Sequence, residues 1–282
     1  MTAATVSLVI CTHNRGQRLG PFLAHLAELR LPGYSEIIIV DSASTDETPT
    51  ILAQAQALAR WPGKLLRVPI RGLGRARNTG WLAARGDIVA FTDDDCYVSP
   101  NLLECYLQVF AEHERVGCVG GRVLLHDPQD ARITIKESAD PVILPPGAFV
   151  PPGFVLGANF AFRRDALASE GGFDPELGAG TRFPCEDVDM AARCSAAGWA
   201  VMYDPRPVVR HHHGRRTVEE VRALRVGYDA GRGAYMMKAL LDPRRRGNYA
   251  RRFLTRLRSE SPRLWYPDIA AGWRYFMRRW LA

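Results

Sequence analysis

The regular alternation of short apolar runs with longer amphipathic stretches is the feature of this sequence that most restricts its fold. Four apolar runs lie at 6–12, 36–41, 64–69 and 87–93. Their length and their β-branched residues predict strands that are buried on both faces. Continuous apolar strands joined by amphipathic helices are typical of a parallel sheet that is covered on both sides. We therefore expect an α/β fold with a mostly parallel central sheet flanked by helices.

The stretches between these runs predict three helices, at 18–30, 44–60 and 74–85. The first has apolar residues at helical spacing, and the second opens with a Ser-Thr-Asp sequence of the kind that caps helix N-termini. The later segment 126–155 is rich in proline and weakly patterned. It predicts a long loop beside the functional site.

Charge divides the chain into two parts. Residues 1–214 contain 20 Lys and Arg against 24 Asp and Glu, a net charge of −4, whereas residues 215–282 contain 17 against 6, a net charge of +11. A break this sharp marks an organisational boundary. We expect one domain over residues 1–214, followed by a basic, aromatic-containing helical extension over residues 215–282.

The cysteines and the lack of a long apolar segment indicate where the protein works. No Cys-x-x-Cys pair occurs, so the sequence signals neither a zinc site nor a disulfide framework. No stretch approaches the roughly 20 apolar residues of a membrane span, and the N-terminus has no basic region before an apolar segment. We expect a cytoplasmic protein, or one bound peripherally to the inner face of the membrane.

Polar residues collect where the predicted strands end, and the densest group is Asp93, Asp94 and Asp95. Carboxylates this close raise one another's pKa unless a cation offsets their charge. In open parallel sheets, ligands bind beyond the carboxyl ends of the strands. Mg²⁺ and Mn²⁺ prefer carboxylate oxygens and keep phosphate oxygens as partners. A divalent cation together with a nucleotide diphosphate would explain the cluster.

A dinucleotide-binding fold fits the sequence less well. It needs Gly-x-Gly-x-x-Gly at the first strand-to-helix turn, where this chain reads CTHNRGQRLG. Gly72 and Gly74 come later in the chain, and Arg77 stands where the third glycine belongs. No Walker loop occurs either, so the nicotinamide interpretation is weak.

Two further polar motifs lie downstream. Glu186 and Asp187 form an acidic pair at a predicted helix start, and three histidines at 211–213 follow a short apolar run. Each motif alone also has a structural explanation, since carboxylates at a helix N-terminus complement its dipole and three consecutive histidines point in different directions. Their order along one chain favours a shared site.

These motifs resemble a known family over roughly residues 5–213. In chain order they are VSLVICTHNR, EIIIVDSASTDET, GRARNTG, DIVAFTDDDC, GANFAFRRDAL, GGFDPELGAGTRFPCEDVDMAARCSAAGWAVMYDP and VVRHHH. The set is similar to the family 2 inverting glycosyltransferases, whose fold is the Rossmann-like, nucleotide-binding GT-A fold. The basic extension is not covered by the resemblance.

The resemblance implies roles for individual residues. Asp187 matches the catalytic base, and Asp41 matches the acidic residue that accepts a hydrogen bond from the nucleotide base, which favours uridine. The implied donor-binding residues are Thr12, Asn14, Arg15, Asp41, Arg77, Asn78, Asp93 and Asp94. The implied metal-binding residues are Asp95 first, then Asp93, His211 and His213. The implied acceptor-binding residues are Gly157, Asn159 and Glu186.

The implied activity is a metal-dependent inverting glycosyltransferase of the hexosyltransferase class. It would use Mn²⁺ or Mg²⁺ and move a sugar from a nucleotide-diphosphate donor, preferably a UDP-sugar, to a hydroxyl of a glycan, lipid or secondary metabolite. One carboxylate base suffices for a single displacement, whereas retention needs a second carboxylate on the opposite face of the sugar. Because Asp187 begins a helix, we expect the dipole to lower its pKa.

Two alternatives remain for the body of the chain. The first is a catalytically inactive protein of the same fold that binds nucleotide sugars or glycans. The second is a sugar nucleotidyltransferase, but that class requires a Gly-rich first loop, and the first loop here, CTHNRG, is not Gly-rich. An intact Asp95 and Asp187 favour the transferase.

The basic extension predicts amphipathic helices. Residues 221–241 form the first, with Leu224, Tyr228, Met236 and Leu240 directed inward. The last helix carries Ile269, Trp273, Phe276 and Trp280 at helical spacing beside Arg274, Arg278 and Arg279. This pattern suits an anionic membrane surface, or packing on the body or in a homodimer. We expect no nucleic-acid partner, because no recognised binding module is present.

Overall fold

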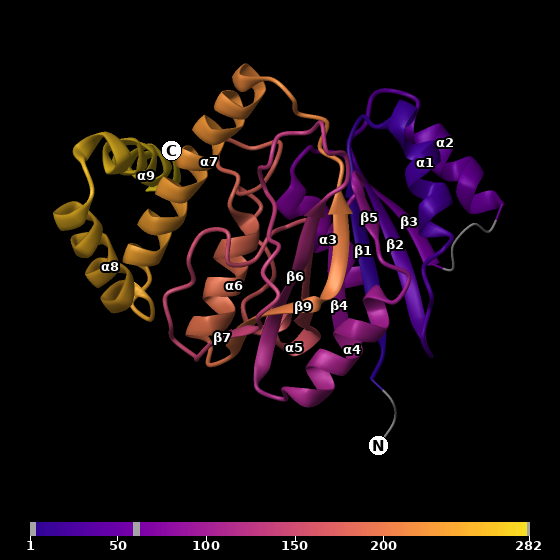
Figure 1. Ribbon diagram of the computed structural model, residues 1–282, viewed down its shortest axis with the longest axis horizontal. Helices are drawn as coiled ribbons and strands as arrows, with labels where there is room; N and C mark the ends of the chain where they lie inside the picture. Colours follow the sequence, from indigo (N-terminus) through magenta and orange to yellow (C-terminus); the bar gives the residue numbers. More distant parts are fainter. Residues whose placement is uncertain (1–3, 59–62, 281–282) are drawn as a thin grey trace.

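The computed structural model describes residues 4–58 and 63–280, apart from the side chains of Leu264 and Trp280 (Figure 1). Its strands are β1 (Val6–Thr12), β2 (Ser35–Ser42), β3 (Gly63–Val68), β4 (Ile88–Asp93), β5 (Cys96–Val98), β6 (Val116–Leu125), β7 (Val142–Leu144), β8 (Asn159–Arg163) and β9 (Ala200–His211). Its helices are α1 (Gly16–Leu26), α2 (Thr48–Ala57), α3 (Leu73–Ala83), α4 (Leu102–Glu112), α5 (Arg164–Ser169), α6 (Glu186–Ala196), α7 (Val218–Leu241), α8 (Arg246–Ser259) and α9 (Pro262–Trp280).

The described strands form one sheet in the order β3-β2-β1-β4-β8-β6-β9-β5, with β7 added beside β9. The four N-terminal strands pair in parallel, which confirms the expected α/β fold. The other half is mixed, since β8 runs antiparallel to both β4 and β6, while β6 and β9 are parallel. The structure therefore confirms the four predicted strands, whereas the antiparallel pairing of β8 does not follow from the sequence.

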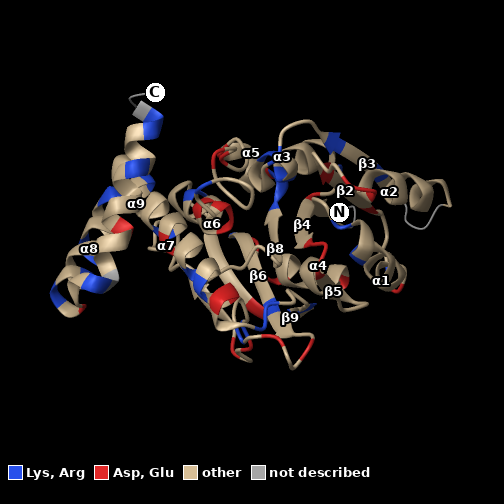
Figure 2. Ribbon diagram, turned by 90° about the horizontal axis from the view of Figure 1, so that it is seen from above, with Lys and Arg blue, Asp and Glu red and all other residues tan. Residues whose placement is uncertain are grey.

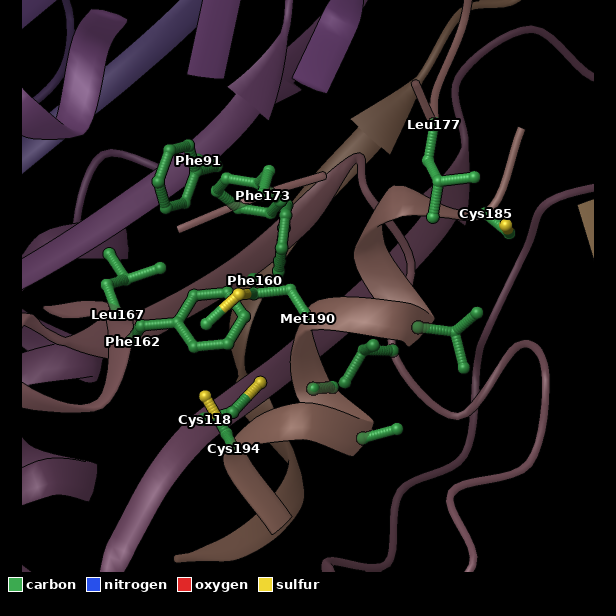
Figure 3. Close-up of a cluster of buried hydrophobic side chains, with 14 of the residues drawn as sticks. Phe91, Cys118, Phe160, Phe162, Leu167, Phe173, Leu177, Cys185, Met190 and Cys194 are labelled. Atoms are coloured by element: carbon green, nitrogen blue, oxygen red, sulfur yellow. The ribbon is translucent and has the colours of Figure 1, made fainter. Parts of the chain in front are cut away.

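Alternating side chains of the central strands fill two apolar cores, one on each face of the sheet. Val9 of β1 and Phe91 of β4 point to one face, and Leu8 and Ile10 point to the other. On the first face, Phe91, Phe160, Phe162 and Phe173 pack edge to face or tilted, with Met190 of α6 beside them (Figure 3). This core holds α6, and with it the acidic pair at its N-terminus, against the sheet.

The helices of the C-terminal region lie together on the α6 side of the body (Figure 1). Helix α7 begins with a capping box, in which Thr217 and Glu220 exchange side-chain and backbone hydrogen bonds. Tyr235, Tyr249 and Tyr275, one from each of the three helices, belong to the same core as Phe91. The composition break at residue 214 is thus bridged by shared packing, and the division into 1–214 and 215–282 stays a prediction.

Three local expectations differ from the structure. The first helix ends at Leu26 instead of continuing to residue 30, ahead of Pro32 and Gly33. The second starts at Thr48, because residues 44–47 form the turn after β2, and its predicted last two residues lie outside the described part. Tyr228 of α7 is 38% exposed instead of directed inward. Within the described residues, no helix is both long and apolar enough to cross a bilayer.

Candidate functional site

The register of the sheet brings polar residues from distant loops to one edge. Thr12 at the end of β1 pairs with Asp41 of β2, and Asp93 closes β4 on the other side of β1. Antiparallel pairing of β5 with β9 sets Cys96 opposite His211, so the histidine segment joins the same edge. The aspartate cluster, the first loop and the histidines therefore meet, as the sequence predicts.

Asp94 is buried and bonded to the first loop. Thr12 Oγ1 donates to Asp94 Oδ2 at 2.5 Å, and Arg15 Nε lies 3.1 Å from Asp94 Oδ1. Burial nevertheless raises the pKa of Asp94 to about 7. One arginine does not fully offset the clustered charge, so protons compete for this site near neutral pH.

Asp95 is the best neutralised member of the cluster. Arg15 Nη2 donates to Asp95 Oδ2 at 2.9 Å, and His211 Nε2 lies 3.4 Å from Oδ1. Burial alone would raise the pKa of Asp95, but His211 and Arg15 outweigh it and lower the pKa to about 2. Burial would likewise lower the pKa of His211, but Asp95 raises it. These opposite shifts describe an ion pair in which the imidazole keeps the proton, and both side chains could ligate a cation once that proton is displaced.

Arg77 is a buried cation between two acidic groups. Its side chain is 1% exposed, and its guanidinium lies 2.5 Å from Glu186 Oε1 and 3.2 Å from Asp93 Oδ1. It also donates to the carbonyl of Gly157 at 3.0 Å and stacks 4.8 Å from the centre of Phe160. Burial raises the pKa of Asp93, and it raises that of Glu186 to about 7. The guanidinium therefore contacts protein groups on all sides. Its single positive charge does not cancel the effect of burial on the pKa values of Asp93 and Glu186.

Asp187, the second residue of α6, is half-buried. The N–H of Gly157 donates to Asp187 Oδ2 at 2.8 Å, and the N–H of Val188 donates to Oδ1 at 2.7 Å. Burial raises the pKa of Asp187 despite Arg77 and these donors. The expected lowering by the helix dipole is wrong in direction, because the loss of water outweighs the dipole. Each oxygen accepts one hydrogen bond and keeps a lone pair for another.

Asp41 is buried at the end of β2. Its Oδ1 accepts from the N–H of Ser44 at 3.0 Å, whereas its buried Oδ2 accepts no hydrogen bond among the described residues. Arg67 Nε is 3.3 Å from that oxygen. A buried carboxylate oxygen without a hydrogen bond is costly, so this oxygen is suited to an N–H of a ligand.

Three predicted residues use their polar atoms to hold the fold. Asn14, with φ of 51°, links the first loop to Thr45 through side-chain hydrogen bonds. Asn78 donates to the carbonyl of Phe173 and accepts from its N–H. Asn159 is fully buried and bonds only to protein groups on three other segments. As placed here, neither Asn78 nor Asn159 offers a polar atom to a ligand.

The three histidines separate as an extended segment requires. His211 faces Asp95, and His212 turns to the other side, where its ring lies beside His126. His213 lies next to His211, but its Nε2 bonds to the carbonyl of Ala131 and its Nδ1 accepts from the N–H of Arg215. His213 therefore has no free lone pair for the metal predicted there.

Two residues near the site were not identified from the sequence. The charge of Arg215 acts on both Asp95 and His211, so it lies on the metal side. Tyr228 of α7 is 38% exposed as a whole residue, but burial of its hydroxyl end and the nearby charge of Asp187 raise its pKa. Its helix also lies against Pro184, directly before the acidic pair, since Gly231 approaches the carbonyl of that proline. The sequence signal that could have identified Arg215 as a site residue is the high content of basic residues in the extension.

The donor set on the metal side fits a divalent cation. Asp95, His211 and Cys96 place ligand-type atoms within 4.8 Å of one another. Burial raises the pKa of the Cys96 thiol well above its usual range, which leaves the carboxylate and imidazole as ligands. Asp93 and Asp94 add carboxylates whose pKa values are raised by burial, and their clustered negative charge would be offset by added positive charge. A hard cation supplies that charge.

A family model describes more than half of this chain. Residues 7–169 match the model of glycosyl transferase family 2. The chain belongs to glycosyl transferase family 2. The matched region includes the first loop, Asp41, Arg77 and the three aspartates, and it ends before Asp187.

Known relatives and structures agree with this membership. The chain is 38% identical over 82 residues to "Uncharacterized glycosyltransferase alr2836" of Nostoc, an alignment that covers 29% of this chain and 26% of that protein. The chain thus spans about a quarter of the length of that curated relative. Mannosyltransferase PcManGT from Pyrobaculum calidifontis, solved with GDP-Man and Mn²⁺, superposes with a TM-score of 0.68 at 22% identity, over 94% of this chain and 73% of that one.

A second solved structure is similar over nearly the whole chain. TarS 1-349 of S. aureus, in complex with UDP-GlcNAc, superposes with a TM-score of 0.68 at 17% identity, over 97% of this chain and 81% of that one. These likenesses show that this family 2 chain has the GT-A fold.

Proposed function

We propose that this family 2 protein is a metal-dependent inverting glycosyltransferase that moves a sugar from a nucleotide-diphosphate donor, with UDP-sugars preferred, to an acceptor hydroxyl. The arrangement around Arg77 carries the proposal. Asp93 lies on one side of its guanidinium, and Glu186, followed by Asp187, lies on the other. One buried cation would thereby hold the proposed donor site and the proposed base at a fixed separation.

The donor would bind across the strand ends. The Oδ2 of Asp41, which lies 3.3 Å from Arg67 but accepts no hydrogen bond among the described residues, would accept the imide N–H of a pyrimidine in a charge-assisted hydrogen bond. Asp95 and His211, with Asp93 or Asp94, would hold Mn²⁺ or Mg²⁺, which when bound offsets the charge of the departing diphosphate. Arg15, now paired to Asp94 and Asp95, is close enough to serve the phosphates too.

Asp187 would act as the base. Its two backbone hydrogen bonds fix the carboxylate, and the remaining lone pairs accept the proton of the acceptor hydroxyl as that oxygen bonds to the anomeric carbon. The bond from that carbon to the diphosphate oxygen breaks in the same step, so the configuration inverts. A pKa raised by burial makes Asp187 a stronger base than a free aspartate.

The bound molecules of the structural neighbours support the donor class. One neighbour was solved with UDP-GlcNAc and the other with GDP-Man and Mn²⁺. Asp41 is the reason to prefer uridine, since its buried Oδ2 accepts no hydrogen bond among the described residues and could accept one from the imide N–H of uracil. The sugar and the acceptor are not assigned.

Calorimetric titration with UDP and GDP, each with and without Mn²⁺, tests this function. We expect UDP to bind more tightly with Mn²⁺ than without, and Asp41→Ala to weaken UDP binding. The slow hydrolysis of a UDP-sugar by the same protein should be lost in Asp187→Asn. Binding with no hydrolysis or transfer in any condition would support the inactive binding protein instead.

A further inference from the structure

Helix α9 packs on the protein through only one of its faces. Ala271 and Tyr275 are buried, and Gly272 approaches the backbone of Gly233 on α7 closely enough to leave no room for a Cβ atom. Asp268 on the same face is buried and receives Arg232 and Arg256 from the other two helices. This face combines close backbone contact with buried ion pairs, and Arg278 and Arg279 near the end of the helix pair with Glu176 and Asp174 of the body.

The opposite face of α9 is apolar and open. Tyr266, Ile269, Trp273 and Met277 are 66, 39, 56 and 38% exposed. Their spacing of three, four and four residues places them on one stripe of the helix. Large apolar side chains that form a continuous exposed stripe indicate an interaction surface, whereas isolated exposed apolar residues are common and indicate nothing. The packing-on-body explanation for Ile269 and Trp273 is thus wrong, while the side chain of Trp280 lies outside the described residues.

Arginines border this stripe. Arg263 lies one turn before Tyr266, and Arg274 lies one turn before Met277. Both are exposed and form no ion pair with any carboxylate in the described part of the chain, and the same holds for Arg251 and Arg258 on α8. Figure 2 shows the resulting concentration of basic residues along α8 and α9.

We propose that the outer face of α9, formed by Tyr266, Ile269, Trp273 and Met277 with Arg263 and Arg274, binds the surface of an anionic lipid bilayer. Trp and Tyr favour the boundary between headgroups and acyl chains, and unpaired arginines beside them are complementary to lipid phosphates. A helix of this kind lies in the interface without crossing it. The inference goes beyond the proposed transfer reaction, which does not use this surface.

Charge argues against a second copy of the chain as the occupant. A two-fold interface brings the same patch of both subunits together, so Arg263 and Arg274 would face the arginines of the partner. The whole region 215–282 carries a net charge of +11. Like charges at an interface are unfavourable, whereas an anionic bilayer offsets them.

Sedimentation with lipid vesicles tests the proposal in the absence of any nucleotide sugar, so its outcome is independent of the transferase activity. The full chain should bind vesicles of phosphatidylcholine mixed with phosphatidylglycerol at low salt, and it should bind pure phosphatidylcholine much more weakly. Added salt should weaken the binding, since screening shortens the reach of the arginines. No binding to the anionic vesicles at low salt would overturn the proposal.

Matched variants separate the outer face from the rest of the surface. Ile269→Ser with Trp273→Ser should lower vesicle affinity about tenfold or more, because two inserted apolar groups are lost. Leu82→Ser, at a 67% exposed residue of α3, should leave it unchanged. Arg274→Glu should weaken binding, whereas Arg85→Glu on the body should not.

Circular dichroism and the concentration dependence of the sedimentation coefficient complete the test. The variants should keep the wild-type spectrum, because the altered side chains are exposed. If Ile269→Ser with Trp273→Ser leaves vesicle binding intact, or if it instead abolishes a dimer of the wild-type chain, the bilayer is not the occupant of this face.

Discussion

Asp187 and Asp189 lie two residues apart on α6, and their surroundings shift their pKa values in opposite directions. Asp187 shares the single guanidinium of Arg77 with Asp93 and Glu186, and burial raises its pKa. Asp189 is fully buried, but Lys238 Nζ at 2.7 Å and Arg193 Nε at 2.9 Å hold its pKa well below the usual range against the effect of burial.

The difference distinguishes the candidate site from a cluster whose charges are paired within the protein. Around Asp189 the cations match the charge, since Arg245 also lies 3.4 Å away and Lys238 bridges to Asp174 at 2.7 Å. Around Arg77 the carboxylates outnumber the cations, so the cluster favours the binding of a proton, a metal ion or a substrate. Lys238 comes from α7. The basic extension therefore neutralises the cluster around Asp189, while the cluster around Arg77 keeps an excess of negative charge.

The largest expected effect is on turnover. Asp187→Asn keeps the size of the side chain but cannot take a proton, so transfer should fall by roughly 10² to 10⁴ while donor binding survives. Steady-state kinetics, with the anomeric configuration of the product read by NMR, measure this. Asp165→Asn, an exposed carboxylate at the far end of the sheet next to β8, should be neutral. Near-normal turnover by Asp187→Asn would move the base to Glu186, and a retained configuration would exclude single displacement.

The second effect is on stability. Lys238→Met leaves Asp174 and Asp189 with fewer cations in a buried setting, and should lower the free energy of unfolding by about 3 to 5 kcal/mol. Urea denaturation measures it. The control is Lys64→Met, whose amino group bonds only to the carbonyl of Ala83 and should cost about 1 kcal/mol. An equal loss in the free energy of unfolding in both variants would show that Lys238 is not needed to stabilise the buried charge of Asp189.

The third effect is pH dependence. Glu186 has its pKa raised from 4.5 to about 7, so between these values the folded protein holds a proton that the unfolded chain has lost. Its contribution to stability is therefore greatest at low pH and falls by on the order of 3 kcal/mol as pH rises to about 7.

Glu186→Gln, which cannot ionise, should flatten the change of the urea midpoint between about pH 5 and 7. Asp189 sharpens the contrast, since its lowered pKa gives a contribution that is constant over this range and is lost only in strong acid. An unchanged pH profile in Glu186→Gln would assign the proton uptake to another member of the cluster.

The smallest effect is on metal binding. Saturating Mn²⁺ with UDP should raise stability by up to about 3 kcal/mol at a hundredfold excess over the dissociation constant. Asp95→Ala should remove this gain. The matched control is Asp127→Ala in the group of Asp127, Asp130 and His212, where Arg216 already pairs with both carboxylates. A gain lost in Asp127→Ala and kept in Asp95→Ala would place the metal at that second group.

The sequence by itself determined the parallel half of the sheet and the composition of the site. Runs such as 6–12 and 87–93 are mostly apolar and rich in β-branched residues, and such runs favour strands that are buried on both faces. Asp93, Asp94 and Asp95 at a strand end predict a nearby positive charge, since clustered negative charge is costly in any fold.

Only the tertiary structure decided what each polar residue does. Asn159 and His213 look like ligands in the sequence, yet antiparallel pairing in the mixed half places them where backbone groups need partners. Asp187 and Asp189 look alike in the sequence, and they differ because Asp189 forms ion pairs with Lys238, Arg193 and Arg245. Pairing and burial depend on contacts between distant segments, and no local pattern of residues encodes those contacts.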